Sequence, residues 1–243
     1  MPRTDFPQEW QDWVAQNVAR GCSSAEIFNT LVKEGFAAEV AERALNIRRV
    51  ALKRFPSDRI ELYTAEGFLT GPECEELVDI IKDSLRPSTI SHDGTADSSF
   101  RTSRTCDLTG GEPAVRALDE RICGAMGIDP RMAEASQGQY YEITQEFKPH
   151  TDYFEPYELE RNSTPTLGQR TWTFMIYLND VEAGGETHFV NVGLKVPPRA
   201  GTAVLWNNLK RDGMPNYDTL HHGTPVTAGY KAIITKWFRR TRS

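Results

Sequence analysis

The feature that most limits the fold is a succession of short strand-like segments in the second half of the chain. They lie at 139–144, 171–178, 187–190, 194–196, 202–206 and 231–238. Turn signals such as Asn179-Asp180, Gly184-Gly185 and Pro197-Pro198 separate them. Because helical patterns come before these strands, they predict an α+β protein built on a sandwich or jelly roll with supporting helices.

Helical patterns fill much of the first half. Residues 1–48 predict three short helices, with Ser23 as an N-cap and Glu26 closing a capping box. Two more helices are expected at about 72–85 and 112–126, and the polar segments 91–107 and 153–170 are expected to be long loops. The basic run at 48–54 marks a boundary, so we expect a small helical domain at 1–55 and a larger domain at 56–243.

Composition excludes several classes of function. The 243 residues include 28 basic and 34 acidic side chains, and the net charge of −6 argues against a nucleic-acid-binding surface. No apolar run approaches the ~18 residues of a membrane span, and the first residues lack a signal-peptide profile, so we expect a cytoplasmic protein with no membrane partner. The four cysteines form no CxxC pair, which argues against a disulfide framework.

A His-x-Asp pair, His150 and Asp152, stands in the run FKPHTDYF. On an extended segment, residues two apart point to the same face, so the imidazole and the carboxylate could bind one metal ion. The pair alone is a weak signal, because a surface loop can show the same pattern.

A second cluster strengthens the metal interpretation. His221 and His222 come just before an apolar strand that contains Lys231. Two histidines and one carboxylate are the ligand set of non-haem Fe(II) oxygenases. A buried lysine beyond the metal would pair with the distal carboxylate of bound 2-oxoglutarate, whereas a zinc hydrolase needs a general base beside its metal instead.

Four runs resemble, in the same order, the catalytic domain of the prolyl 4-hydroxylases: YEITQEFKPHTDYF, RTWTFMIYLNDVEAGGETHF, GTAVLWNN and HHGTPVTAGYKAIITKWF. The resemblance covers about residues 59–240. It implies a double-stranded β-helix (jelly roll) dioxygenase domain at 56–243, with Fe(II), 2-oxoglutarate and O2 as cofactors and ascorbate as a candidate reductant. The implied reaction is hydroxylation like that of procollagen-proline 4-dioxygenases.

The resemblance also implies roles for individual residues. It makes His150, Asp152 and His221 the iron ligands, and Lys231 the partner of the cosubstrate's C5 carboxylate. The third ligand is expected at His221 rather than His222, because the family's ligand stands ten residues before its lysine.

Four further residues are candidates for binding cosubstrate or substrate, and each also has a purely structural explanation. Tyr141 and Thr187 match cosubstrate-binding residues, although a core aromatic and a packed strand threonine would look the same. Arg170 stands at a position linked to substrate binding in the family, with a solvated arginine as the alternative. Trp237 falls on the strand of Lys231, where it is expected either to form a wall of the substrate cleft or to belong to the core.

Departures from the family pattern leave the substrate open. Thr144, Thr224 and Val190 stand where the family usually has glycine, cysteine and proline. We expect a prolyl residue in a peptide or protein as substrate, and the alternative is a free amino acid or a small peptide natural product. A binding module without turnover is a third reading, against which the intact ligand set argues.

The helical domain allows two interpretations. Its glycine-phenylalanine turn, Gly35-Phe36, vaguely resembles that of ubiquitin-associated-type modules, which would suggest that the domain binds a peptide or protein substrate. A helical cap on the catalytic domain is favoured instead, because Trp10 and Trp13 on one helix face are more than a small free-standing bundle needs. The sequence does not give the oligomeric state.

Overall fold

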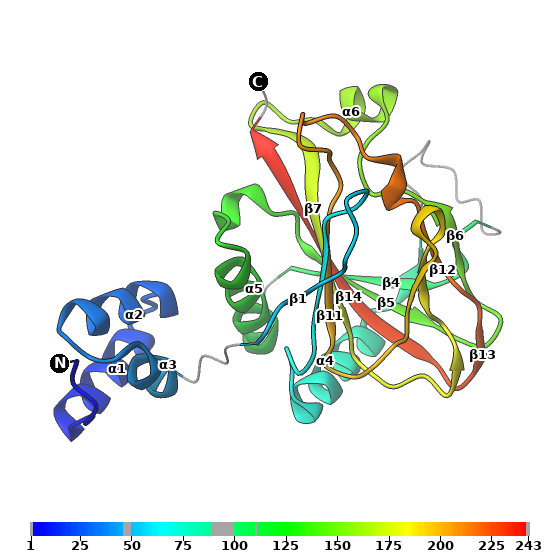
Figure 1. Cartoon of the computed structure of the whole chain (residues 1–243). Coiled ribbons are helices and arrows are strands. Elements are labelled where there is room, and N and C mark those ends of the chain that lie inside the picture. Colours follow the sequence, from blue (N-terminus) through cyan, green and yellow to red (C-terminus); the bar gives the residue numbers. More distant parts are fainter. Residues whose placement is uncertain (1, 46–49, 89–99, 110, 242–243) are drawn as a thin grey trace. The chain divides into compact units, whose positions relative to one another are not determined.

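The computed structural model describes residues 2–45, 50–88, 100–109 and 111–241. The chain forms two compact units, Met1–Val50 and Ala51–Ser243, and each is described by itself (Figure 1). The contacts divide the chain after Val50, whereas the sequence analysis places the boundary after residue 55.

The first unit is a small three-helix bundle, as the sequence predicts. Its helices are α1 (Gln8–Ala19), α2 (Ser24–Lys33) and α3 (Ala38–Ala44). The predicted capping box is present, since Ser23 and Glu26 bond each other's backbone N–H. Trp10 and Trp13 pack against the bundle's own core. They are therefore accommodated within this unit, and they give no argument for a cap.

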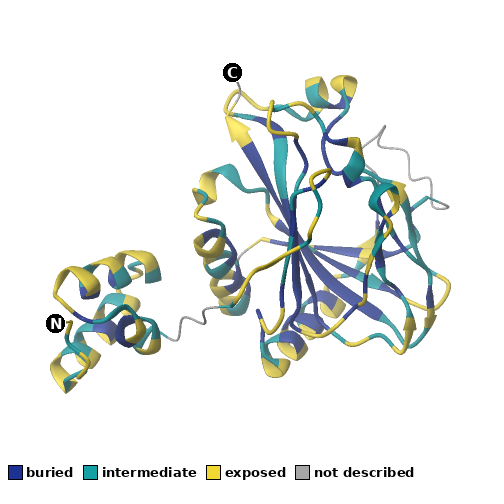
Figure 2. Cartoon of the chain, viewed as in Figure 1, coloured by how far each residue is buried: buried dark blue, intermediate teal, exposed yellow. Residues whose placement is uncertain are grey.

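The larger unit is built on an eight-stranded sheet in which every pair is antiparallel. In sheet order the strands are β1 (Lys53–Arg54), β2 (Leu62–Ala65), β11 (Ala203–Asn207), β7 (Leu167–Tyr177), β14 (Lys231–Thr241), β5 (Ser136–Tyr141), β4 (Arg104–Leu108) and β3 (Arg86–Pro87). β14 is an interior strand between β7 and β5, and its residues 231–239 are all buried (Figure 2).

A smaller antiparallel sheet lies across the core from the large one (Figure 1). Its strands, in order, are β10 (Leu194–Val196), β9 (Thr187–Phe189), β12 (His221–Gly223) and β6 (Phe147–His150), and β13 (Val226–Ala228) pairs separately with β8 (Ala183–Gly184). The helices α4 (Gly71–Asp83) and α5 (Pro113–Met126) cover the other face of the large sheet. Shorter elements are α6 (Pro156–Asn162) and the 3₁₀ turns η1 (Pro130–Met132), η2 (Val190–Val192) and η3 (Tyr217–Thr219). The predicted jelly-roll class is confirmed.

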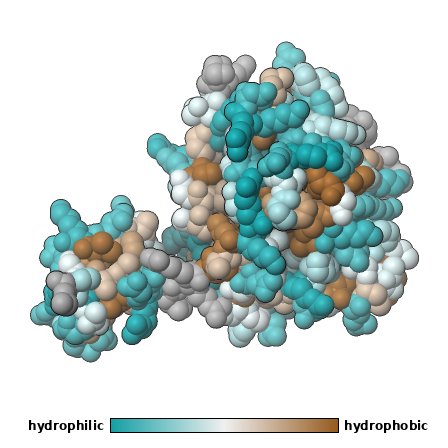
Figure 3. Space-filling model, in the orientation of Figure 1, coloured by the Kyte–Doolittle hydropathy of each residue, from teal (hydrophilic) through white to brown (hydrophobic). Residues whose placement is uncertain are grey.

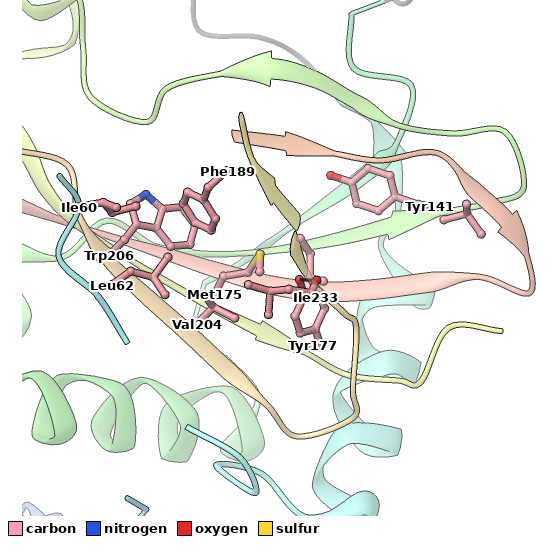
Figure 4. Close-up of a cluster of buried hydrophobic side chains, with 11 residues drawn as sticks. Ile60, Leu62, Tyr141, Met175, Tyr177, Phe189, Val204, Trp206 and Ile233 are labelled. Atoms are coloured by element: carbon pink, nitrogen blue, oxygen red, sulfur yellow. Dashed lines mark hydrogen bonds between the residues drawn. The ribbon is translucent and has the colours of Figure 1, made fainter. Parts of the chain in front are cut away.

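The core between the two sheets is apolar and close to the site. Figure 4 shows Met175, Ile233 and Tyr177 gathered in its middle, with Phe189 against Trp206. Hydrophilic side chains cover most of the face that Figure 3 shows. Among the described residues, no helix combines the length and apolar character that a membrane crossing requires.

Three expectations about local structure were wrong. The segment predicted as a loop over 91–107 contains the start of β4, and its residues 91–99 lie outside the described part. The segment 153–170 contains α6 and the start of β7. The strand expected at 139–144 runs over Ser136–Tyr141 and includes Gly138, whose missing Cβ lets Ile81 of α4 approach the sheet closely.

Candidate active site

Two side chains that are close in sequence, His150 and Asp152, meet a distant third, His221, at the junction of β6 and β12. His150 is the last residue of β6, Asp152 follows two residues later, and His221 opens β12 directly opposite His150. One ligand atom from each residue lies within 4.8 Å of the others. The Nε2 atoms of His150 and His221 are 3.9 and 4.0 Å from the carboxylate oxygens of Asp152. This arrangement could hold one metal ion.

Backbone and hydroxyl groups orient all three side chains. Nδ1 of His150 bonds the carbonyl of Lys148 at 2.8 Å, and Nδ1 of His221 bonds that of Thr219 at 3.0 Å. Each ring therefore presents Nε2 to the shared space. The hydroxyl of Thr173 donates to Oδ2 of Asp152 at 2.7 Å. Such outer contacts fix the direction of metal ligands before the metal arrives.

The protonation states suit a cation. Burial, with the nearby His221, lowers the pKa of His150 well below its ordinary value. Burial alone would raise the pKa of Asp152, but His221, His150, Arg170 and the Thr173 hydroxyl outweigh it and the pKa is lowered. A neutral imidazole and an ionised carboxylate are the forms that bind divalent metals.

The side chain of His222 points to the opposite face of β12 from that of His221, away from the three ligands. Its Nε2 is 2.9 Å from a carboxylate oxygen of Glu146, and it pairs across the sheet with His188. The geometry thus brings together His150, Asp152 and His221 and leaves His222 out.

Lys231 opens β14 opposite Tyr141 of β5. The lysine is 1% exposed, its Nζ donates to the carbonyl of Gly185 at 3.0 Å, and it lies 4.4 Å from the centroid of the Tyr141 ring. No ion pair among the described residues includes it, and burial lowers the pKa of its ammonium to about 8 in spite of Glu186. A buried cation of this kind is suited to an added carboxylate.

A single cleft joins the metal ligands to the lysine. Its lining residues include Tyr141, Thr187 and Trp237 as well as the three ligands and Lys231. Gly223 helps to leave room at the lysine end, since a Cβ there would lie 3.4 Å from Nζ. The ligand set fits Fe(II), and the lysine end fits the distal carboxylate of 2-oxoglutarate.

Arg170 and Thr187 are both held by neighbours. The guanidinium of Arg170 pairs with Glu134 at 2.6 Å and stacks over Trp237 at 4.2 Å, so it lies behind the lining rather than in it. The hydroxyl of Tyr177 donates to Oγ1 of Thr187 at 2.6 Å.

The sequence analysis missed a polar wall of the cleft formed by Gln139 and Thr235. It also missed Arg101, which is 7% exposed, donates to Gln137 at 2.8 Å and stacks over Phe147. Alternation along β5 could have revealed Gln139, because it stands two residues before Tyr141 and therefore shares its face.

Fold and site together define a 2-oxoglutarate-dependent Fe(II) oxygenase, and the model of the 2OG-Fe(II) oxygenase superfamily matches residues 136–239. Within this class the chain belongs to the prolyl 4-hydroxylase family. It is 31% identical over 242 residues to probable prolyl 4-hydroxylase 10 of Arabidopsis thaliana, covering 90% of this chain and 81% of that protein. The expected cofactors, Fe(II) and 2-oxoglutarate, are confirmed with the family.

Other relatives match a smaller part. Prolyl 4-hydroxylase subunit alpha-1 of Homo sapiens is 34% identical over 184 residues, which are 74% of this chain and 34% of that protein. The chain thus spans about a third of the length of its animal relatives. The viral collagen prolyl hydroxylase of Paramecium Bursaria Chlorella virus-1, solved with 2-oxoglutarate, has the same fold, with a TM-score of 0.58, 23% identity and coverage of 74% of this chain and 96% of that one.

Proposed function

We propose that the protein hydroxylates a prolyl residue of a peptide or protein in a reaction that consumes 2-oxoglutarate and O2. The observation that carries the proposal is the cleft with a two-histidine, one-carboxylate site at one end and the buried Lys231 at the other. The names of its relatives support prolyl hydroxylation.

The protein's own groups hold and orient the reactants. His150, Asp152 and His221 would hold the metal, and a ligand set of this kind would leave coordination positions for the reactants. Lys231 binds the C5 carboxylate, so that its single positive charge and the two of Fe(II) balance Asp152 and the 2-oxoglutarate dianion. The bound metal and cosubstrate supply the oxidative chemistry, in which decarboxylation to succinate accompanies hydroxylation.

Further contacts follow from the lining. Tyr141 and Thr187 lie on the cosubstrate side, where we expect them to bind its carboxylate. Trp237 and the Arg170 guanidinium behind it form the wall on the other side of Asp152, where we expect the substrate. Ascorbate as reductant and a cytoplasmic location stay predictions.

The test is succinate formation, measured with free proline, polyproline peptides and whole-cell protein as substrates. We expect succinate and a one-oxygen mass increase on proline residues of a peptide or protein. Turnover with free amino acids alone would replace this proposal with the amino-acid hydroxylase alternative. No succinate with any substrate would leave the fold as a binding module.

The metal site has a matched pair of variants. Anaerobic Fe(II) with 2-oxoglutarate should give a visible charge-transfer band that His221→Ala abolishes. His222→Ala removes the neighbouring imidazole of the same strand and should keep the band. The reverse outcome would show that the third ligand is assigned to the wrong histidine.

A further inference from the structure

Three polar side chains form a hydrogen-bonded chain along the wall of the cleft. Tyr141 donates its hydroxyl proton to Oε1 of Gln139 at 2.7 Å, and Nε2 of Gln139 donates to Oγ1 of Thr235 at 3.1 Å. All three residues line the cleft, and none is more than 5% exposed. The chain therefore runs in one direction, from Tyr141 to Thr235.

The direction matters because a phenol has one proton. Burial raises the pKa of Tyr141, although the charge of Arg101 and hydrogen bonds from Ser103 and Arg101 oppose it, so the hydroxyl keeps that proton. A carboxylate only accepts hydrogen bonds. Tyr141 can therefore donate to the cosubstrate carboxylate only if it gives up its bond to Gln139, which would leave a buried amide oxygen without a donor.

A side-chain amide can solve this conflict by turning over. Rotation of Gln139 about its last torsion exchanges its oxygen and nitrogen, and this torsion has two broad wells. The amide N–H then donates to the Tyr141 oxygen, while the Thr235 hydroxyl donates to the amide oxygen. Gln139 keeps a hydrogen bond to each of its two neighbours before and after the turn, and the direction of both bonds has reversed.

We propose that Gln139 is a positioning residue that sets the direction of the Tyr141 hydroxyl proton. Without 2-oxoglutarate, the Gln139 amide oxygen accepts the hydrogen bond of Tyr141. When Tyr141 donates to the cosubstrate carboxylate, the amide turns over and its N–H donates to the Tyr141 oxygen. This rests on the proposed function. A side chain that only accepts hydrogen bonds cannot take this role. A carboxylate at position 139 would therefore keep accepting the hydrogen bond of Tyr141 and compete with the cosubstrate for it.

The first test observes the turn directly in the unmodified protein. With Zn(II) in place of iron and selective amide labelling, the side-chain N–H of Gln139 should show nuclear Overhauser contacts to the Thr235 methyl group. On addition of 2-oxoglutarate these should be replaced by contacts to the Tyr141 ring. Unchanged contacts in a protein that has bound 2-oxoglutarate would overturn the turn-over. A protein that binds no 2-oxoglutarate would instead contradict the proposed function.

The second test is a double-variant cycle. Gln139→Glu should raise the dissociation constant of 2-oxoglutarate, measured by calorimetry on the anaerobic Mn(II) protein, by about thirtyfold or more, since a charged acceptor holds the proton strongly. The same change in Tyr141→Phe should have an effect about tenfold smaller, because only charge repulsion remains.

Gln137→Glu is the matched control for added charge. Gln137 lies two residues before Gln139 on β5, accepts a hydrogen bond from Arg101, and does not line the cleft. It should change the dissociation constant far less than Gln139→Glu. If Gln139→Glu raised the dissociation constant equally in the parent and in Tyr141→Phe, charge repulsion alone would explain the effect. The proposed role of Gln139 would then be wrong.

Discussion

Two lysines on one strand, five residues apart, are both buried and yet have opposite surroundings. Lys231 and Lys236 of β14 are 1% and 4% exposed. Lys236 donates to a carboxylate oxygen of Asp119 in α5 at 2.8 Å and to the carbonyl of Glu134 at 3.1 Å. Lys231, on the face that lines the cleft, has the carbonyl of Gly185 as its one hydrogen-bond partner in the described part of the chain.

The difference separates a structural cation from one that is reserved for a ligand. The charge of Lys236 is neutralised inside the protein, so its role is complete when the chain has folded. Burying a cation without a carboxylate destabilises a fold, and the depressed pKa of Lys231 is the sign of that cost. Such a cost is typical of a functional site.

The largest expected effect is on cosubstrate binding. Lys231→Met should weaken binding of 2-oxoglutarate by two orders of magnitude or more, because removal of one partner of a buried pair costs ~3–5 kcal/mol. Metal binding should remain. Calorimetric titration of the anaerobic Mn(II) protein measures the affinities for metal and for 2-oxoglutarate. An unchanged 2-oxoglutarate affinity would show that Lys231 does not bind the cosubstrate.

The second prediction concerns pH and stability without cosubstrate. Because the pKa of Lys231 is about 8 in the folded protein and 10.5 ordinarily, the unfolded chain binds more protons between these values, and stability rises with pH there. Lys231→Met should therefore be more stable than the parent by about 3 kcal/mol at pH 7. The difference should shrink towards pH 10 in urea titrations, and a difference independent of pH would contradict the assignment.

The opposite sign is expected for the other lysine. Lys236→Met should destabilise the protein by about 1–3 kcal/mol, since Asp119 loses its charged partner but keeps the Ser136 hydroxyl and is 29% exposed. Its 2-oxoglutarate affinity should stay within about twofold. Urea unfolding and the same calorimetric titration test this, and a large loss of affinity would move the cosubstrate role to Lys236.

The smallest effect should come from removing the whole ion pair. Asp119→Leu with Lys236→Met replaces two charges by apolar side chains and should leave stability within about 1 kcal/mol of the parent. Unfolding midpoints of the double variant and of both single variants provide the measurement. Nζ of Lys236 also donates to the Ser136 hydroxyl at 3.3 Å, and additive losses would mean that this bond and the one to the Glu134 carbonyl hold the lysine rather than Asp119.

Local patterns in the sequence predicted what depends on near neighbours. The capping box of Ser23 and Glu26 and the strand at 194–196 require only a few adjacent residues. The strand at Ser136–Tyr141 was misplaced because Gly138 has low strand propensity, and its burial against Ile81 depends on a helix far away in the sequence.

The site shows the same limit. His221 could be assigned only through the family resemblance, because its position opposite His150 is set by pairing between β12 and β6. No sequence spacing indicates that Arg170 pairs with Glu134, since 36 residues separate them. Gln139 was overlooked although its alternation with Tyr141 was visible, because a glutamine on a strand has no metal or acid–base role of its own.

The interior place of β14 has a consequence for synthesis of the protein. It follows every other described strand in the chain, yet its partners β5 and β7 stand on either side of it. Until residues 231–241 leave the ribosome, both neighbouring strands expose unpaired backbone edges, which are sites of aggregation. The metal ligands are made earlier than Lys231. Pairing of β14 with both neighbours therefore closes the sheet and also brings Lys231 into the cosubstrate pocket.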